Sequence, residues 1–351
     1  MTPKAPFDET PTNPSRNARP ALAIAVGAWA IHEGITAADY AAQGALAEEL
    51  GFHSYWLPEN HFGDQTTLPS PLMTLTAVAA TTSRLGLGTG SYLLPIRHPL
   101  LAAEEVAVLD RLSNGRVMLG VGRGYQGPMF RAFDVSIKEK RNVFERSLGT
   151  MIEAWSGVPV PTGSETKAGT PETVTLSPLP VQRPHPPIWI AAFGPKALAQ
   201  AGRLGLPYIA SPVETLEVLA ANLAVYDEAL RDADQTPHHT VPVMRTTFVS
   251  RSATRVREVK AALAESAREM AKSPTAAMRR AGDAAIDDWA LVGEPNEVAD
   301  RIAAYRDGIG LTHLIATRTR LRAVKTPEMV ASMELLAGVA QTLCASGREQ
   351  S

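Results

Sequence analysis

The chain has 351 residues, 45% of them hydrophobic, and 34 basic against 36 acidic side chains give it a formal net charge of −2. Because the sequence holds no basic patch and no apolar stretch of about 20 residues, we expect neither a nucleic-acid partner nor a membrane span. Cys344 is the only cysteine, which excludes a disulfide framework and a cysteine-based zinc site and suits a reducing cytoplasm.

The predicted elements alternate between short apolar runs and longer helical patterns, which is typical of βα units in a parallel sheet. Residues 1–20 come first, rich in Pro, Thr and Asn without an apolar signal region, and we interpret them as a disordered leader. The predicted strands are 21–27, 54–58, 85–89, 117–121, 188–192, 208–210, 241–249 and 311–317. The predicted helices are about 37–50, 69–83, 100–112, 138–155, one from Pro195, 214–231, two between 251 and 282, and 326–342.

Eight strands with helices between them predict an α/β fold of the (β/α)₈ TIM-barrel type, formed by a single domain over residues 21–346. A doubly wound open sheet is the alternative. Residues 156–187 follow the fourth helix and are dense in Gly, Pro, Ser and Thr. We expect them to be an irregular, extended loop insertion and a candidate lid, since loops of that length are usually functional or mobile.

Polar residues follow the second predicted strand as Glu59-Asn60-His61. The carboxyl ends of parallel strands share one face, where active sites form. A carboxylate, an amide and an imidazole in that position suit proton handling or ligand recognition. The alternative is a hydrogen-bonded loop that caps the barrel. No metal site is expected, because His-x-x-x-His spacing is absent here and no Asp/His cluster supplies three ligands.

Small residues follow the third predicted strand as Thr89-Gly90-Ser91. Such a step lets the backbone approach a flat ring closely, sometimes through a strained peptide bond. A β-bulge is the alternative.

The fourth predicted strand runs into Gly122-Arg-Gly124-Tyr-Gln-Gly127, which matches the dinucleotide-binding pattern G-x-G-x-x-G. That pattern belongs to the first strand of a βαβ unit and needs an acidic residue further on, and neither condition holds here. Gly124 still lets the backbone approach a ligand, and Arg123 with Arg141 could bind a phosphate. Either arginine alone is more often a solvated charge.

The predicted helix after the fifth strand opens with Phe193-Gly194-Pro195-Lys196. A helix N-terminus with glycine is a ready anion site, and Lys196 adds positive charge. An ordinary turn is the alternative.

In order and spacing, these segments resemble the bacterial luciferase-like monooxygenase family from about Ala21 to Leu343. The resemblance rests on Glu-x-His-Phe at 59–62, Leu-Asp-Arg-Leu-Ser-Asn-Gly-Arg at 109–116, Gly-Arg-Gly at 122–124, Pro-Pro-Ile-Trp at 186–189 and Gly-Glu-Pro-Asn-Glu-Val at 293–298, which opens a late helix. It implies a TIM barrel that binds reduced FMN, or in one branch the deazaflavin coenzyme F420, at the strand carboxyl ends.

The implied activity is that of a flavin-dependent monooxygenase, which uses reduced FMN and O₂ to oxygenate a small organic substrate through a flavin C4a-peroxide. Reduced FMN would come from a separate flavin reductase or through weak NAD(P)H binding. Two alternatives stay open. One is a deazaflavin-dependent oxidoreductase that transfers a hydride, and the other is a non-catalytic flavin-binding protein.

The resemblance also implies roles for single residues. His61 and Glu59 match its catalytic segment, His98 aligns with a histidine near that site, and Asn60 replaces a histidine that acts in catalysis. These four are the predicted catalytic residues. Gly90-Ser91 matches a non-prolyl cis peptide beneath the flavin ring, and Gly122 replaces a cysteine near it. The implied cofactor-binding residues are Thr89, Gly90, Ser91, Arg123, Gly124, Arg141, Phe193, Gly194, Pro195 and Lys196, with Gly194 and Ala197 in place of hydroxyl phosphate ligands.

The resemblance further implies a cytoplasmic homodimer that pairs through its second and third helices. The Ala-rich faces of residues 72–82 and 101–109 would permit the close packing that such an interface needs.

Overall fold

The computed structural model of the chain describes residues 21–64, 66–167, 169–273 and 276–348. The predicted leader, residues 1–20, lies outside them. The described residues form two compact units. The first unit holds His32–Ala45 and Leu57–Ile188, and the second holds residues 21–31, Leu46–Trp56 and residues 189–348. No described helix is both long and apolar enough to span a membrane.

The first unit contains a short parallel sheet covered by helices. Strand β3 pairs with β5 at Leu87 and Val117, and β4 pairs with the end of β5 at Tyr92 and Val121. Helix α3 packs on both α2 and α5. The elements are α2 (Pro71–Thr81), β3 (Gly86–Thr89), β4 (Tyr92–Leu93), the 3₁₀ helix η1 (Leu94–Ile96), α3 (Pro99–Leu112), β5 (Val117–Gly122), α4 (Gly127–Ala132), α5 (Lys140–Trp155), β6 (Val160–Glu165) and β7 (Pro171–Val174).

The second unit contains a longer parallel sheet in the order β2-β1-β12-β10-β11. A bridge between Ala210 and Val243 joins the end of β9 to β10, and β8 pairs with β9. Its elements are β1 (Ala23–Gly27), β2 (Ser54–Leu57), β8 (Ile188–Ala191), α6 (Pro195–Arg203), β9 (Tyr208–Ile209), α7 (Leu216–Asp232), β10 (Pro242–Val249), α8 (Ala253–Ala271), α9 (Ala276–Asp283), α10 (Ile286–Trp289), β11 (Ala290–Gly293), α11 (Pro295–Ile309), β12 (His313–Thr317) and α12 (Thr326–Arg348). Helix α1 (Ala37–Glu49), β2 and β8 each have residues in both units.

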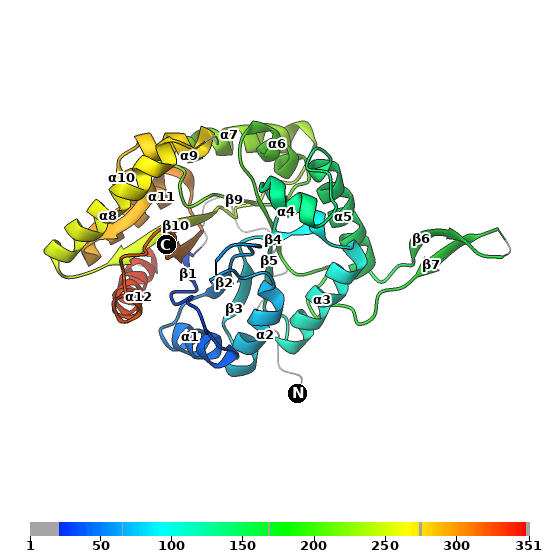
Figure 1. Ribbon diagram of the computed structural model, residues 1–351, viewed down its shortest axis with the longest axis horizontal. Helices are drawn as coiled ribbons and strands as arrows, with labels where there is room; N and C mark the ends of the chain where they lie inside the picture. Colours follow the sequence, from blue (N-terminus) through cyan, green and yellow to red (C-terminus); the bar gives the residue numbers. More distant parts are fainter. Residues whose placement is uncertain (1–20, 65, 168, 274–275, 349–351) are drawn as a thin grey trace. The chain divides into compact units, whose positions relative to one another are not determined.

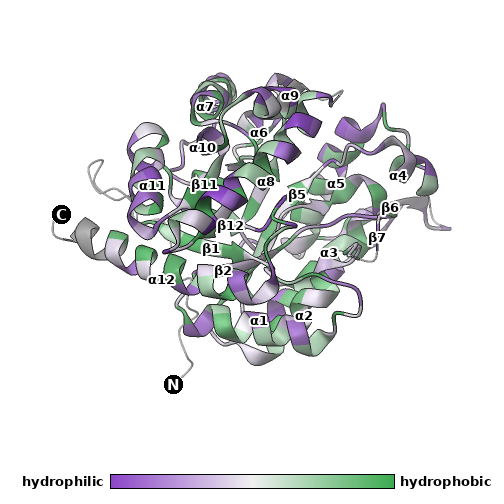
Figure 2. Cartoon of the chain, turned by 60° about the vertical axis from the view of Figure 1, so that its left-hand side comes forward, coloured by the Kyte–Doolittle hydropathy of each residue, from purple (hydrophilic) through white to green (hydrophobic). Residues whose placement is uncertain are grey.

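The α/β class is confirmed, because strands that pair in parallel alternate with helices in both units. Apolar residues concentrate in the strands, whereas the helices alternate hydrophobic and hydrophilic residues (Figure 2). This is the pattern expected of a parallel sheet that is covered by helices and buried on both faces. All eight predicted strands are present, with boundaries within two residues of the prediction.

The interpretation of residues 156–187 as irregular was wrong in part. They contain β6 and β7, an antiparallel hairpin that extends away from α3 and α5 of the same unit (Figure 1). In β6 only Val160 is buried, and β7 is exposed throughout. With both faces in water, these strands lack the apolar alternation by which a strand is recognised in a sequence. Strand β11 was also missed, because its four residues directly follow α10 without a turn signal.

The stretch Leu109–Arg116 is a structural anchor of the first unit. The buried Asp110 carboxylate accepts hydrogen bonds from the Val181 and Gln182 N–H groups at 2.7 and 2.9 Å, which fixes the chain beyond the hairpin on α3. The buried Arg116 guanidinium donates to the carbonyl oxygens of Ala79, Thr82, Leu85 and Ser113. Both charged groups are therefore satisfied within the fold, as buried polar groups must be.

The second unit holds two partly buried histidines in an aromatic cluster. The His313 ring lies edge-on to His53 and Trp189, with centroids 5.4 and 5.0 Å away, and Trp189 stacks on Trp56 at 5.1 Å. Burial, together with repulsion from His53, lowers the pKa of His313 to about 3. Burial also lowers the pKa of His53. Both rings are therefore neutral in the folded protein near neutral pH.

This pair predicts a loss of stability in acid. An unfolded histidine has a pKa of about 6.5, so the unfolded chain binds more protons than the folded one once the pH falls below that value. The free energy of unfolding should therefore fall as the pH drops from about 6.5 towards 3. Urea unfolding of His313→Gln should show a flatter dependence on pH between 7 and 4.5 than the wild type. The exposed His32→Gln variant is the control, and equal slopes for all three proteins would contradict the assignment.

Candidate active site

The buried carboxylate of Glu59 is the centre of the candidate site in the first unit. Glu59 follows the end of β2, and its side chain has no exposed surface. Its Oε1 lies 2.7 Å from Arg97 Nη2 and 2.6 Å from His61 Nε2, and its Oε2 accepts the Leu93 N–H at 2.9 Å. One carboxylate thus joins the loop after β2 to the segment that follows β3.

Arg97 completes this arrangement, and the sequence analysis missed it. Its Nη1 donates to the Leu93 carbonyl at 2.8 Å, and its guanidinium lies 4.0 Å above the centre of the Tyr92 ring. Burial raises the pKa of the Tyr92 phenol, which donates to Glu105 at 2.7 Å. A buried carboxylate is stabilised by hydrogen bonds or by a cation, and Glu59 has both. If Glu59 had been predicted to be buried, Arg97 would have been a candidate for the cation that pairs with it, because Arg97 directly precedes the predicted site residue His98.

His61 lies between the carboxylate and an aromatic pair. Its side chain is only 8% exposed, and the ring centroids of Phe133 and Phe62 lie 5.1 and 5.9 Å away. Phe62, at 68% exposure, presents its ring to solvent. Because Glu59 fixes one ring nitrogen of His61, the imidazole has a defined orientation beside an accessible apolar surface. Such a histidine can hold or move a proton.

Asn60 has a structural contact in this loop. Its side-chain oxygen accepts the Leu68 N–H at 2.6 Å, and its own N–H donates to the Leu68 carbonyl at 3.1 Å. These bonds close the loop from residue 60 to 68. The alternative interpretation of Glu59-Asn60-His61, a hydrogen-bonded loop, therefore holds for Asn60. Its catalytic role stays a prediction.

A cis peptide bond joins Gly90 and Ser91, at the place where the resemblance implies one. Thr89 Oγ1 donates to the Gly120 carbonyl at 2.9 Å, and the Gly90 N–H donates to the Leu57 carbonyl at 2.8 Å. A Cβ on Gly122 would lie 2.1 Å from Ser91 Oγ and 3.0 Å from Ser91 Cβ, so a larger residue there would require the Ser91 side chain to move. The end of β5 and Ser91 are therefore close neighbours.

Three cations gather beyond the end of β5. Lys140 Nζ donates to the Gly124 carbonyl at 3.0 Å, and the Arg123 guanidinium lies 5.8 Å from the centre of the Phe144 ring. Burial and the charge of Arg141 lower the pKa of Arg123 to about 10. Burial and the charges of both arginines lower the pKa of Lys140. Lys140 was missed by the sequence analysis, although it is the neighbour of Arg141 at the start of α5.

Mutual repulsion within this cluster makes it a candidate anion site. Each cation raises the electrostatic cost of its neighbours, and a bound dianion would reverse the sign of that interaction. Gly124 has a φ of 67°, a left-handed backbone conformation that glycine adopts more readily than other residues do, and it lies beside the same cations. The arrangement therefore fits a phosphate group.

His98 is less closely connected to the site than predicted. It is exposed and directly precedes α3, where its carbonyl accepts the Ala102 N–H at 3.0 Å. In the described part of the chain, no hydrogen bond or ion pair joins the His98 ring to Glu59 or His61. Its predicted catalytic role stays a prediction.

The segment Phe193–Lys196 belongs to the second unit and is described there by itself. Pro195 begins α6 as predicted, and Gly194 precedes it with a φ of 74°. The side chains of Phe193 and Lys196 are exposed. That these residues bind the same ligand as Ser91 and Arg123 stays a prediction. Among the residues that the structure describes, no group of three His, Cys, Asp or Glu side chains could hold a metal ion.

Several known proteins are similar to the chain. The oxygenase component of a flavin-dependent trigonelline monooxygenase from Acinetobacter baylyi is 28% identical over 215 residues, which cover 59% of this chain and 58% of that protein. The chain spans about half the length of the curated relatives it matches, for example 46% and 50% of two proteins from Sinorhizobium fredii.

Two solved structures show the same fold. The oxygenating constituent of 3,6-diketocamphane monooxygenase from Pseudomonas putida, solved in complex with FMN, has a TM-score of 0.72 at 19% identity and covers 90% of this chain and 97% of its own. The coenzyme F420 dependent tetrahydromethanopterin reductase from Methanopyrus kandleri has a TM-score of 0.64 at 19% identity and covers 91% and 98%. At these identities the likeness is one of fold.

The family model described as luciferase-like monooxygenase matches residues 21–312, most of the chain. This match agrees with the order of segments on which the resemblance was based. The chain belongs to the luciferase-like monooxygenase family, a family of enzymes.

Proposed function

We propose that the protein is a flavin-dependent monooxygenase that uses reduced FMN and O₂ to oxygenate a small organic substrate. The observation that carries this proposal is the group of Arg123, Lys140 and Arg141, whose charges repel one another beside a glycine-rich strand end. A flavin mononucleotide has the phosphate that such a group would bind. Family membership and the similarity to a flavin-dependent oxygenase component support the choice of cofactor.

The residues of the first unit divide into two tasks under this proposal. The three cations and the Gly124 backbone would hold the phosphate, and Thr89, Gly90 and Ser91 would present a flat backbone surface to the ring. Bound reduced flavin would supply the oxygen-activating chemistry. His61, fixed by Glu59, would hold or move a proton at Nδ1, the ring nitrogen that does not face the carboxylate.

Other parts of the proposal concern assembly and closure. A separate flavin reductase would supply reduced FMN, and the similarity to the oxygenase component of the trigonelline monooxygenase supports this proposal. We propose that the parallel strands close into one (β/α)₈ barrel over residues 21–346, in a cytoplasmic enzyme. The β6–β7 hairpin within residues 156–187 is the candidate lid, because exposed strands that are anchored at Asp110 can move as one piece.

A deazaflavin-dependent oxidoreductase is the second candidate function, because the F420 dependent reductase shares the fold. In that reaction a hydride would pass between substrate and cofactor without O₂. Titrating the protein with reduced FMN and with reduced deazaflavin distinguishes the two, since the tighter ligand identifies the cofactor. Substrate-stimulated O₂ uptake would exclude a non-catalytic flavin-binding protein.

The phosphate assignment predicts a specific pattern of affinities. Arg123→Gln and Arg141→Gln should each weaken reduced FMN binding by about tenfold or more, since a charge-assisted hydrogen bond contributes about 1.5–3 kcal/mol. Their affinity for reduced riboflavin, which lacks the phosphate, should stay within about twofold of the wild type. Anaerobic fluorescence titration measures both.

Lys138→Gln is the matched control, because it removes an exposed positive charge two residues before Lys140. It should bind FMN as the wild type does. Equal losses for riboflavin and FMN, or no loss in either arginine variant, would contradict a phosphate site at this cluster.

The predicted homodimer receives support from exposed apolar residues on α2 and α3. Met73, Leu101, Val108 and Leu112 are 76, 53, 43 and 61% exposed, whereas Leu72 and Leu75 of the same α2 face inward. Exposed large apolar side chains grouped on two helices that pack together are typical of an interface. The dimer surface would therefore include these four side chains in addition to the small alanines.

The variant with Leu101→Glu and Leu112→Glu should be monomeric, because a dimer would bury four unpaired carboxylates. Light scattering at micromolar concentration should give twice the chain mass for the wild type and one chain mass for the variant. Val174→Glu, on the exposed hairpin, is the control and should remain dimeric. A monomeric wild type would refute the dimer.

A further inference from the structure

An arginine stands at the carboxyl edge of the sheet in the second unit. Arg318 directly follows Thr317, the last residue of β12, and Trp29 lies two residues beyond the end of β1. These strands are parallel neighbours, with Ala25 opposite Ile315, so both residues leave the sheet at the same edge. Arg318 Nη1 donates to the Trp29 carbonyl at 2.9 Å. Ligands of open and closed parallel sheets bind at this edge.

The positive charge of Arg318 is not neutralised by the described part of the chain. Its side chain is partly buried, and burial alone lowers its pKa, with no contribution from any carboxylate. Partly buried charges in proteins are normally paired. A guanidinium has five N–H donors, and the bond to Trp29 uses one on Nη1. Nε and Nη2 remain, and these are the side-on pair that binds a carboxylate through two parallel hydrogen bonds.

The backbone next to Arg318 is hydrogen-bonded to a residue of β10. The Thr319 carbonyl accepts the Thr246 hydroxyl at 3.0 Å, and Thr317 Oγ1 donates to Thr319 Oγ1 at 3.0 Å. Trp29, which positions the guanidinium, is itself only 2% exposed and packs edge-on against Tyr55 with ring centroids 6.0 Å apart. Both the start of the loop and the group that orients the arginine are therefore fixed.

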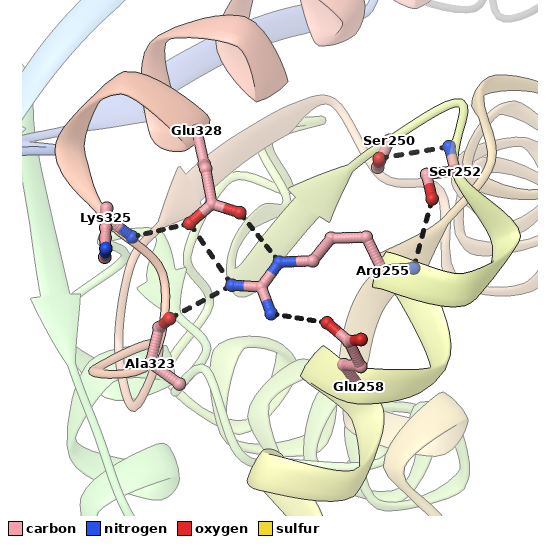
Figure 3. Close-up of polar contacts among 7 residues, drawn as sticks. All are labelled: Ser250, Ser252, Arg255, Glu258, Ala323, Lys325 and Glu328. Carbon is pink, nitrogen blue, oxygen red and sulfur yellow. Dashed lines mark hydrogen bonds and ion pairs between the residues drawn. The ribbon is translucent and has the colours of Figure 1, made fainter.

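The far end of the same loop is clamped between α8 and α12 (Figure 3). Arg255 donates from Nε and Nη2 to the two oxygens of Glu328 at 2.7 and 3.2 Å, and Nη2 also donates to the Ala323 carbonyl at 3.1 Å. The Lys325 N–H donates to Glu328 Oε2 at 3.0 Å. A cation held on a loop that is fixed at both ends is preorganised, so it loses little freedom when a ligand binds.

We propose that Arg318, at the carboxyl edge of the sheet in the second unit, binds the carboxylate of an organic acid. A phosphate would call for several cations, as at Arg123, Lys140 and Arg141, whereas one side-on guanidinium matches one carboxylate. The inference goes beyond the proposed function and does not depend on the identity of the cofactor. Carboxylate binding itself is tested without flavin, so the two can fail separately.

The test titrates the flavin-free full chain with benzoate, cinnamate and octanoate and with the primary amide of each, by isothermal calorimetry. The wild type should bind at least one carboxylate about tenfold or more tightly than its amide, the size of a charge-assisted pair. Arg318→Gln should remove that preference. Arg318→Lys should keep part of it, because an ammonium retains the charge and lacks the side-on pair.

Arg322→Gln is the matched control, since it removes an exposed charge from the same loop and should bind like the wild type. Thermal unfolding of each variant shows that it is folded. The proposal is overturned if no carboxylate is preferred over its amide, or if both Arg318 variants bind carboxylates as the wild type does. It is also overturned if Arg318→Gln weakens reduced FMN binding and leaves carboxylate binding unchanged. A wild type that binds carboxylates and not FMN would refute the proposed function alone.

Discussion

The candidate site depends on one buried charge. The Glu59 carboxylate has no exposed surface, and it meets a cation, an imidazole and a backbone N–H through its two oxygens. Removing one partner of a buried ion pair typically costs about 3–5 kcal/mol, because the other charge is left without compensation. The loop after β2 and the segment Tyr92–Arg97 are thus fixed to each other by the Glu59–Arg97 ion pair. Removing either partner would lower the stability of the protein. The orientation of His61 follows from the same buried carboxylate.

The same unit carries an opposite arrangement a short way along the chain. Glu59 is compensated within the fold, whereas the charge of Arg141 helps to lower the pKa of Arg123, and both arginines help to lower the pKa of Lys140. A charge that is paired within the fold stabilises the structure, whereas a cluster of like charges is stabilised by a bound ligand of opposite charge. This contrast separates the residues that organise the site from those that we propose bind the cofactor. Arg318 in the second unit follows the same reasoning, as a single cation without a carboxylate partner among the described residues.

Much of the fold could be predicted from the sequence, because buried parallel strands leave continuous apolar runs such as Val117–Gly122. The β6–β7 hairpin could not, since its exposed strands leave no such pattern. In the candidate site, the residues at strand ends were predicted by position, and the cis peptide bond lies where the resemblance implied it. Arg97 and Lys140 were missed because their roles come from contacts with Glu59 and Gly124, which are distant in sequence. Conversely, the recognisable stretch Leu109–Arg116 proved to be structural.

We propose that the Glu59 carboxylate organises the residues that, under the proposed function, would bind the flavin. The most direct test is an anaerobic titration of the Glu59→Gln variant with reduced FMN. Glutamine keeps the shape and an acceptor for Leu93 and removes the charge that pairs with Arg97. We predict a folded protein whose affinity for reduced FMN falls by about tenfold or more, because the partly buried Arg97 loses its carboxylate partner and the loop and segment that Glu59 joins are no longer fixed to each other. A folded variant that binds reduced FMN as tightly as the wild type would contradict the account.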